Sequence, residues 1–200
     1  MKPKLYATPL SHFARKVRVV LAELEVPFEL IFVDDLLSSD PEDFGGNPIL
    51  RIPTYRDDDH WVVESDQIAH YIVEKHDPSD GLHVTRLTPD ERNVLSMINA
   101  AMAAEVEILL SQRSGIANIE SENYFRRHFK VMRLCLDWLE AEAPRFWTAN
   151  EFSYLDIALA CMWDHVNHYE TIEGLDRYSW VSERVSMFAA RRSLAESAPT

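Results

Sequence analysis

The sequence predicts two domains, an α/β domain followed by a domain built only of helices. Strand-like and helix-like patterns alternate over residues 4–76, in the order β-α-β and then β-β-α. Every periodicity breaks in the segment HDPSDGLHVTRL, which contains a proline and a glycine, and only helical patterns follow it. We therefore expect domains at residues 1–77 and 88–200, joined by a linker at 78–87.

Composition limits the classes of function. The 200 residues are 46% hydrophobic, enough for two small domains with cores of their own. Lys and Arg total 20 against 33 Asp and Glu, a net charge of −13, so the chain should repel phosphate backbones and bind no nucleic acid. No apolar run approaches the ~20 residues that span a bilayer, and MKPKLYATPL lacks the apolar core of a signal peptide. We expect a soluble, cytoplasmic protein without membrane association.

The two cysteines, Cys135 and Cys161, both lie inside apolar helical patterns. This placement predicts buried, small hydrophobic side chains, not a disulfide framework or a metal site. We expect no metal.

Periodicity and chain breakers give the elements of the first domain. KLYA is a short strand, and apolar residues at helical spacing predict a helix over residues 12–24. FELIFV alternates as a second strand, expected to lie parallel to the first. IPTYRDDDHWVVES predicts a hairpin with an acidic turn. A helix then begins at Ser65, with these residues facing inward: Ile68, Ala69, Ile72 and Val73.

The second domain opens with a complete helix start signal. In TPDE, Thr88 is the expected N-cap, Pro89 the first helical residue and Glu91 the partner in a capping box. A buried stripe follows, formed by Val94, Leu95, Ile98, Ala101 and Met102.

Three more helices complete the second domain. A long helix carries apolar residues from Phe125 to Leu139 and is expected to stop at Pro144. In EFSYLDIALACMW, Ser153 and Asp156 predict a second capping box, and the apolar residues on nearly all sides predict the buried centre of the domain. SERVSMFAARRSLAES is the last helix.

Ser11, in PLSHFARKVRVVLAEL, has two interpretations. A serine at a helix start is a favoured N-cap because its hydroxyl oxygen accepts from an otherwise unpaired backbone N–H. The same place, near the positive end of a helix dipole, favours negative charge and would lower the pKa of a bound thiol. No general base is evident beside Ser11, so it is not expected to be a nucleophile itself.

The segment RIPTY places Pro53 just before a predicted strand. Proline cannot donate to a β-ladder, so it fits best at the first position of the strand, with a cis Ile52–Pro53 bond in a tight turn. Such a turn would leave the backbone of Ile52 able to pair with an extended peptide ligand. The alternative is a simple edge-strand proline.

In ESDQIAHYI, Ser65 is the expected cap of a helix and Glu64 precedes it. Free N–H groups at a helix start can hold a carboxylate, and Glu64 offers a counter-charge to an ammonium group. The pair suits an α-amino acid head group. An ordinary cap beside a surface glutamate is the alternative.

Five segments in this order resemble the cytosolic glutathione transferase superfamily, especially its bacterial, serine-type (theta-like) members. They are LYATPLSHFARKVRVVLAE, NPILRIPTY, ESDQIAHYI, FSYLDIALACMW and ARRSLAES. The resemblance implies a thioredoxin-like N-terminal domain, an all-α C-terminal domain and a homodimer. It also implies glutathione as co-substrate and a small hydrophobic electrophile as acceptor.

The resemblance assigns roles to six residues. Ser11 would stabilise the glutathione thiolate as the catalytic residue. Ile52 would pair through its backbone with the cysteinyl part of glutathione, and Pro53 would be the cis-proline of the turn. The remaining glutathione-binding residues are Glu64 and Ser65, for the γ-glutamyl end, and Arg51, for the glycine carboxylate.

Three positions depart from the family pattern. His12 stands where many serine-type relatives have proline, and we expect an exposed histidine at the helix start. NPIL replaces the more usual Asn-Pro-x-Gly, which weakens the assignment of Arg51. Tyr6 lies roughly where tyrosine-type members keep their catalytic hydroxyl, and we expect a core residue whose hydroxyl has a partner.

Two other functions compete with that of an enzyme. The fold also serves in non-catalytic interaction proteins, such as stringent-starvation-type regulators and assembly modules, and in ligandin-like carriers of apolar compounds. A complete set formed by Ser11, Glu64 and Ser65 favours glutathione chemistry over an interaction protein. A carrier would bind glutathione weakly and show no loss on Ser11→Ala.

Overall fold

The computed structural model describes residues 2–116, 119–147 and 151–199. Its contacts divide the chain into two compact units, Met1–Arg86 with Arg191–Thr200, and Leu87–Ala190. The predicted order, an α/β domain and then a helical one, is confirmed. The unit boundaries differ from the expected ones, because residues 78–86 of the expected linker and residues 191–200 group with the α/β unit.

The first unit is built on a four-stranded sheet with the order β2-β1-β3-β4. The strands are β1 (Lys4–Ala7), β2 (Glu29–Phe32), β3 (Thr54–Arg56) and β4 (Trp61–Val63). β1 pairs with β2 in parallel, as the β-α-β order predicts, and β3 is antiparallel to both β1 and β4. The mixed sheet of a thioredoxin-like domain is thereby formed.

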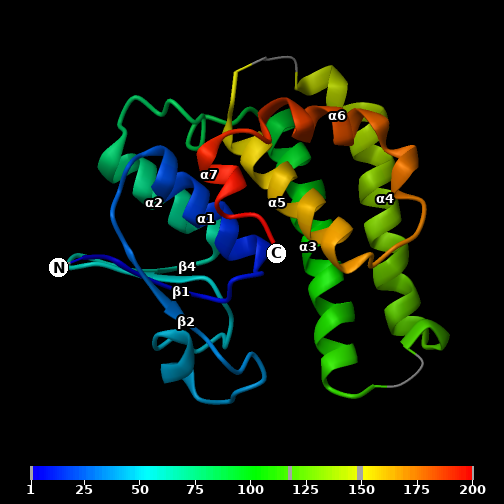
Figure 1. The fold of residues 1–200 in the computed structure, drawn as a ribbon, viewed down its shortest axis with the longest axis horizontal. Helices are drawn as coiled ribbons and strands as arrows, with labels where there is room; N and C mark the ends of the chain where they lie inside the picture. The colour runs from blue at the N-terminus through cyan, green and yellow to red at the C-terminus, as the bar shows by residue number, and fades with distance from the viewer. Residues whose placement is uncertain (1, 117–118, 148–150, 200) are drawn as a thin grey trace. The chain divides into compact units, whose positions relative to one another are not determined.

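Helices α1 (His12–Glu23) and α2 (Ser65–His76) pack together on one face of this sheet (Figure 1). A short helix, η1 (Pro41–Phe44), lies in the loop after β2. All four residues predicted to face inward on α2 are buried. The core between helices and sheet includes Leu5, Val17, Val20, Leu21, Phe44, Tyr55, Ile68 and Ile72.

The last residues of the chain belong to this unit because they bind α1. Helix α7 (Arg192–Ala195) contacts α1. The buried guanidinium of Arg15 donates to Ser197 Oγ at 3.1 Å and to the Leu194 carbonyl at 3.0 Å. At the far end of α1, Glu23 accepts hydrogen bonds from Arg191 and Ser193.

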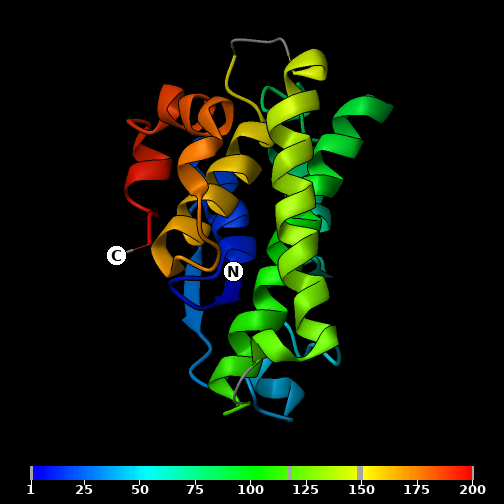
Figure 2. The same cartoon turned by 90° about the vertical axis from the view of Figure 1, so that its right-hand side faces the viewer.

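The second unit is helical. Its long helices α3 (Pro89–Arg113) and α4 (Asn123–Phe146) run side by side (Figures 1 and 2). The other helices are α5 (Tyr154–Tyr169) and α6 (Ser179–Phe188), with the short turns η2 (Ile119–Ser121) and η3 (Leu175–Arg177). α5 contacts α3 and α6 and is buried on nearly every side, so it forms the centre of this unit, as predicted.

Both predicted capping boxes are present. Thr88 Oγ1 accepts from the Glu91 N–H while the Glu91 carboxylate accepts from the Thr88 N–H. At the start of α5 the Asp156 carboxylate accepts from Ser153, and its other oxygen accepts from buried Arg184 Nε at 2.7 Å. The second box is therefore also one half of an internal ion pair.

Pro144 does not stop α4, contrary to expectation, because the helix continues to Phe146. Proline removes the N–H that would bond four residues back and crowds that carbonyl. Here it stands in the final turn, so a single helical bond is lost, and the next turn still closes through Trp147 N–H to the Ala143 carbonyl at 3.0 Å.

Among the described residues, α3 is the one helix long and apolar enough to cross a membrane by length and composition. The core helices of soluble proteins meet the same criterion. α3 carries the buried carboxylate of Glu105 and packs against α4 and α5. Cys135 and Cys161 are both buried thiols, as predicted.

Candidate functional site

The sheet register brings the three segments singled out in the sequence to one edge of the first unit. Tyr6 at the end of β1 pairs with Thr54 at the start of β3, and Thr54 pairs with Val63 at the end of β4. The loop after β1 therefore lies beside the turn before β3 and the segment after β4. Ser11, the Ile52–Pro53 turn and the Glu64–Ser65 pair share this edge, which we call the β1/β3/β4 edge.

Ser11 caps α1. Its backbone is extended, and its Oγ accepts a hydrogen bond from the Ala14 N–H at 3.2 Å. Within the residues that the structure describes, the hydroxyl makes no other hydrogen bond, so its O–H remains available as a donor. A serine hydroxyl can accept and donate at once, so capping the helix does not exclude donation to a ligand.

The Ile52–Pro53 peptide bond is cis, as predicted. Pro53 is buried, and β3 begins at the next residue. Over the described part of the chain, neither the N–H nor the carbonyl of Ile52 has a hydrogen-bond partner. Its backbone is thus able to pair with an added extended segment.

Asn47 organises the loop that leads to this turn. Its buried amide donates to the Arg51 carbonyl at 2.9 Å and to Thr54 Oγ1 at 3.2 Å, and its oxygen accepts from the Ile49 N–H at 3.0 Å. Leu50 has φ +56°, a left-handed conformation that glycine adopts more easily. The chain keeps a glycine-like backbone at the position where the family pattern would place glycine.

Glu64, and not Ser65, occupies the N-cap position of α2, which corrects the expected cap. Ser65 is the first helical residue and is buried, whereas Glu64 is exposed and makes no capping bond. Glu64 has φ +67° and ψ +123°, a strained conformation for a residue with a side chain. The first backbone N–H groups of α2 thus lack a side-chain cap beside an exposed carboxylate.

The remaining sequence candidates are placed as follows. Arg51 is exposed and, among the described residues, forms no ion pair. Tyr6 is half-buried with its ring against Gly45, and its hydroxyl has no partner in the described ranges, so the expected partner is not found. His12 is 2% exposed, so the expectation of an exposed histidine is wrong; its ring lies 4.8 Å from that of Phe13.

Sequence reasoning missed two residues of this edge. Lys16 is buried in α1 and its Nζ lies 2.6 Å from Asp66 Oδ1 in the first turn of α2. Its position gave a signal, since Lys16 follows Phe13 by three residues and precedes Val20 by four, on the inward face. Asn47 was quoted only as part of a loop, and nothing in its pattern indicated three hydrogen bonds.

A second polar cluster ties the hairpin turn to the last turn of α2. The Asp57 carboxylate accepts from Tyr71 at 2.8 Å and from Lys75 at 3.0 Å, and Lys75 also donates to Asp59 at 2.6 Å. Asp57, Asp59 and His60 are close enough together to hold a cation, but the ammonium of Lys75 already bonds both carboxylates. The cluster is therefore a clip between two elements.

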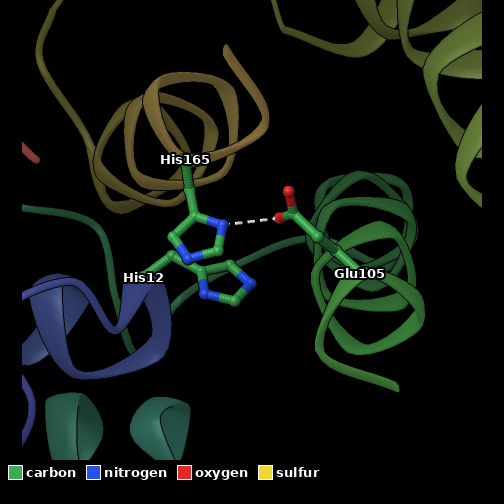
Figure 3. Close-up of side chains that lie close together, drawn as sticks. All are labelled: His12, Glu105 and His165. Atoms are coloured by element: carbon green, nitrogen blue, oxygen red, sulfur yellow. Dashed lines mark hydrogen bonds and ion pairs between the residues drawn. The ribbon is translucent and has the colours of Figure 1, made fainter. Parts of the chain in front are cut away.

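A third polar cluster lies inside the second unit. Glu105 on α3 is fully buried and is hydrogen-bonded to His165 Nδ1 on α5 at 2.7 Å, as Figure 3 shows. Its other oxygen accepts from Thr171 Oγ1 at 2.6 Å. These bonds satisfy both carboxylate oxygens in a place where an unpaired charge would be costly.

Residues 5–80 match the sequence model of one protein family, described as "Glutathione S-transferase, N-terminal domain". This segment contains every residue of the β1/β3/β4 edge. Residues 5–80 form a glutathione S-transferase N-terminal domain. The predicted superfamily is thereby confirmed for residues 5–80, and the predicted fold is confirmed, whereas the serine-type subclass stays a prediction.

Solved glutathione transferases resemble the whole chain in fold. The enzyme from Methylobacterium radiotolerans, in complex with glutathione sulfonate, is 23% identical with a TM-score of 0.82, covering 100% of this chain and 95% of that one. A Pseudomonas fluorescens family member with bound glutathione is 20% identical with a TM-score of 0.82, and both chains are fully covered. No curated protein matches the sequence significantly.

Proposed function

We propose that the protein is a serine-type glutathione transferase that joins glutathione to a small hydrophobic electrophile or uses glutathione to reduce or isomerise one. The observation that carries the proposal is the convergence on the β1/β3/β4 edge. Three features lie there together: a serine hydroxyl able to donate, the Ile52 backbone and the start of α2 beside Glu64. Among the described residues, the Ile52 backbone has no hydrogen-bond partner and the start of α2 has no side-chain cap.

In the proposed reaction Ser11 acts on a sulfur that the protein does not itself supply. Its O–H donates to the thiol sulfur of bound glutathione, and the N-terminal end of α1 adds a positive potential. Both favour the thiolate, so the thiol proton leaves to solvent near neutral pH. The thiolate then attacks the electrophile, with rate gained from charge stabilisation and proximity. With a chlorinated aromatic acceptor the C–S bond forms, the C–Cl bond breaks and chloride leaves to solvent.

The other residues would hold the tripeptide. The Ile52 backbone pairs with its cysteinyl part, and the turn at Pro53 shapes this contact. The first N–H groups of α2 and the Ser65 hydroxyl hold the γ-glutamyl carboxylate, while Glu64 faces the ammonium group. Arg51, exposed and near the turn, serves the glycine carboxylate.

We further propose a cytoplasmic homodimer, as the superfamily resemblance implies. Several of the similar solved structures have glutathione or an analogue bound, which supports glutathione as the ligand of this protein.

Calorimetry and kinetics test the proposal on the wild type and on three variants, Ser11→Ala, Glu64→Ala and Ser65→Ala. Glutathione should bind the wild type, and the Glu64 and Ser65 changes should weaken binding about ten-fold. Ser11→Ala should lower kcat with a chlorinated aromatic acceptor about 100-fold, the usual loss for one donor to a developing anion. It should also raise the apparent pKa in the pH–rate profile.

Two controls separate chemistry from helix capping. Thr88→Ala removes an N-cap from α3 and should reproduce any loss of stability without loss of rate. Ser11→Gly keeps most of the capping preference and should still lose the rate. Absence of glutathione binding at millimolar concentration would refute the proposal and favour an interaction protein; binding without turnover and without any effect of Ser11→Ala would favour a carrier.

A further inference from the structure

Lys16 carries a charge at a fully buried position of the first unit. Its side chain is 0% exposed, its Nζ lies 2.6 Å from Asp66 Oδ1, and it stands 5.3 Å above the ring of Phe13. The Asp66 side chain is 34% exposed. The pair joins α1 to the first turn of α2, two helices that pack together.

An apolar pair would usually be at least as stable in such a place. Removing two charges from water is costly, and well-packed hydrophobic replacements of buried ion pairs are often neutral or stabilising. What an ion pair adds is direction, since its geometry fixes one element against another. Asp66 also lies where the dipole of α2 favours a negative charge, so the pair fixes the helix start in particular.

The first turn of α2 requires contacts that hold its backbone in place. Glu64 keeps a strained backbone and caps nothing with its side chain. A strained conformation persists only when the surrounding structure holds it. Asp66 is two residues further along, and Lys16 extends from the helix that Ser11 caps.

We propose that Lys16 and Asp66 are positioning residues which hold Glu64 and Ser65 in place relative to Ser11, and so set the affinity for the γ-glutamyl end of glutathione. The inference rests on the proposed function. Lys16 itself is buried, so it acts on the ligand only through Asp66 and the first turn of α2.

The test uses Lys16→Met, which keeps the length of the side chain, and the double variant Lys16→Met/Asp66→Asn, which leaves no buried charge unpaired. Both should raise the Kd and the KM for glutathione about ten-fold. Their kcat at saturating glutathione should stay within about two-fold of the wild type, because Ser11 is untouched. Unchanged affinity in Lys16→Met would overturn the inference.

The clip at the other end of α2 offers a matched control. The side chains of Lys75 and Asp57 are 33% and 4% exposed, so the acid is the buried partner here, whereas the lysine is the buried partner in the Lys16–Asp66 pair. Lys75→Met/Asp57→Asn should lower the Tm at least as much as the Lys16 double variant, yet change the Kd less than about two-fold. Equal weakening by both double variants would mean that loss of stability alone affects binding, and the inference would fall.

Hydrogen exchange of the ligand-free protein separates this inference from the proposed function. Amides in the first turn of α2, residues 65–69, should exchange about ten-fold faster in Lys16→Met than in the wild type, and no faster in the Lys75 control. Unchanged exchange there would overturn the positioning role even if glutathione binds. A wild type that binds no glutathione would refute the proposed function and the ligand part of the inference, while faster exchange would still uphold the positioning role.

Discussion

Leu50 adopts a loop conformation that is energetically unfavourable for a residue with a side chain. Its φ of +56° places a β-carbon in the left-handed region, which costs roughly 1–2 kcal/mol for a residue other than glycine. The Asn47 side chain holds the loop in this shape, because it accepts from the Ile49 N–H and donates to the Arg51 carbonyl, on either side of Leu50. The conformation therefore belongs to the loop, and the leucine adapts to it.

Leu50→Gly should raise the free energy of unfolding by up to about 1 kcal/mol, since release of the strain exceeds the added chain entropy and the lost partial burial. Leu50→Val should lower it, because a β-branched residue is still less suited to positive φ. Urea unfolding of the three proteins measures both changes. A less stable glycine variant would show that packing by the leucine outweighs the strain.

Single residues also show where sequence reasoning reaches its limit. Ser11 was predictable as a cap because a helix start needs a side-chain acceptor for its first N–H groups. The burial of His12 was not predictable, because it depends on tertiary packing that helix periodicity does not encode. The cap of α2 was misplaced by one residue because a strained Glu64 takes the N-cap position without forming a capping bond.

At the scale of elements, α2 is fixed at both ends by polar clips. The clip at its C-terminal end centres on Asp57. Burial alone would raise the pKa of Asp57, but hydrogen bonds from Tyr71, the His60 N–H and Lys75 outweigh it and lower the pKa to about 2. A carboxyl whose pKa falls on folding stabilises the fold while it is ionised.

This lowered pKa predicts an acid-dependent loss of stability. The contribution of Asp57 should be complete above about pH 4 and be lost as the pH falls toward about 2. Asp57→Asn should therefore cost roughly 2 kcal/mol at pH 7 and much less at pH 2. Urea unfolding across this pH range measures the difference. Equal losses of stability in the wild type and in Asp57→Asn between pH 7 and pH 2 would contradict this role of Asp57.

The start of α5 predicts the largest loss from one element. Asp156 closes the capping box with Ser153 and neutralises buried Arg184. Asp156→Ala should lower the free energy of unfolding by about 3–5 kcal/mol, because it leaves the guanidinium without its carboxylate. Glu91→Ala opens the capping box of α3, whose hydrogen bonds are exposed, and should cost only about 1 kcal/mol. Equal losses in thermal unfolding would contradict the role of Arg184.

Elements with strong local signals were predicted well. Both capping boxes, the inward face of α2 and the parallel pair of β1 and β2 follow from spacing and order alone. The predicted stripe of α3 is buried except for Leu95, which is half-buried. The end of α4 did not, because a proline in a final turn removes one bond and leaves the next turn intact. Interactions between elements, such as that of Lys16 with Asp66, depend on register and helix packing that no local pattern specifies.

At the scale of the whole molecule, the first unit depends on residues far along the chain. Deleting residues 191–200 would remove the Ser197 and Leu194 acceptors from the buried guanidinium of Arg15. We expect a loss of about 3 kcal/mol or more in the free energy of unfolding, measured by denaturant titration. Arg15→Met in the shortened chain should recover part of it. No loss on deletion would show that the C-terminal segment is only loosely attached.

The division of the chain into units was predicted only in part. Composition separated the helical region from the α/β region, since loss of strand patterns is visible in the sequence. The return of the last ten residues to the first unit was not visible, because ARRSLAES continues a helical pattern and its partners lie on α1. The acidic balance of residues 1–80, with 8 basic and 16 acidic side chains, likewise did not reveal that Arg15 and Lys16 are both held inside the unit.

The attachment of the last residues to α1 has a consequence for synthesis. Synthesis proceeds toward the C-terminus, so residues 87–190 are made before Leu194 and Ser197, which accept hydrogen bonds from Arg15. The α/β unit therefore lacks these contacts until the helical unit has been translated. A nascent chain stalled at residue 190 should leave α1 accessible to proteases. Addition of residues 191–200 should protect α1 from cleavage.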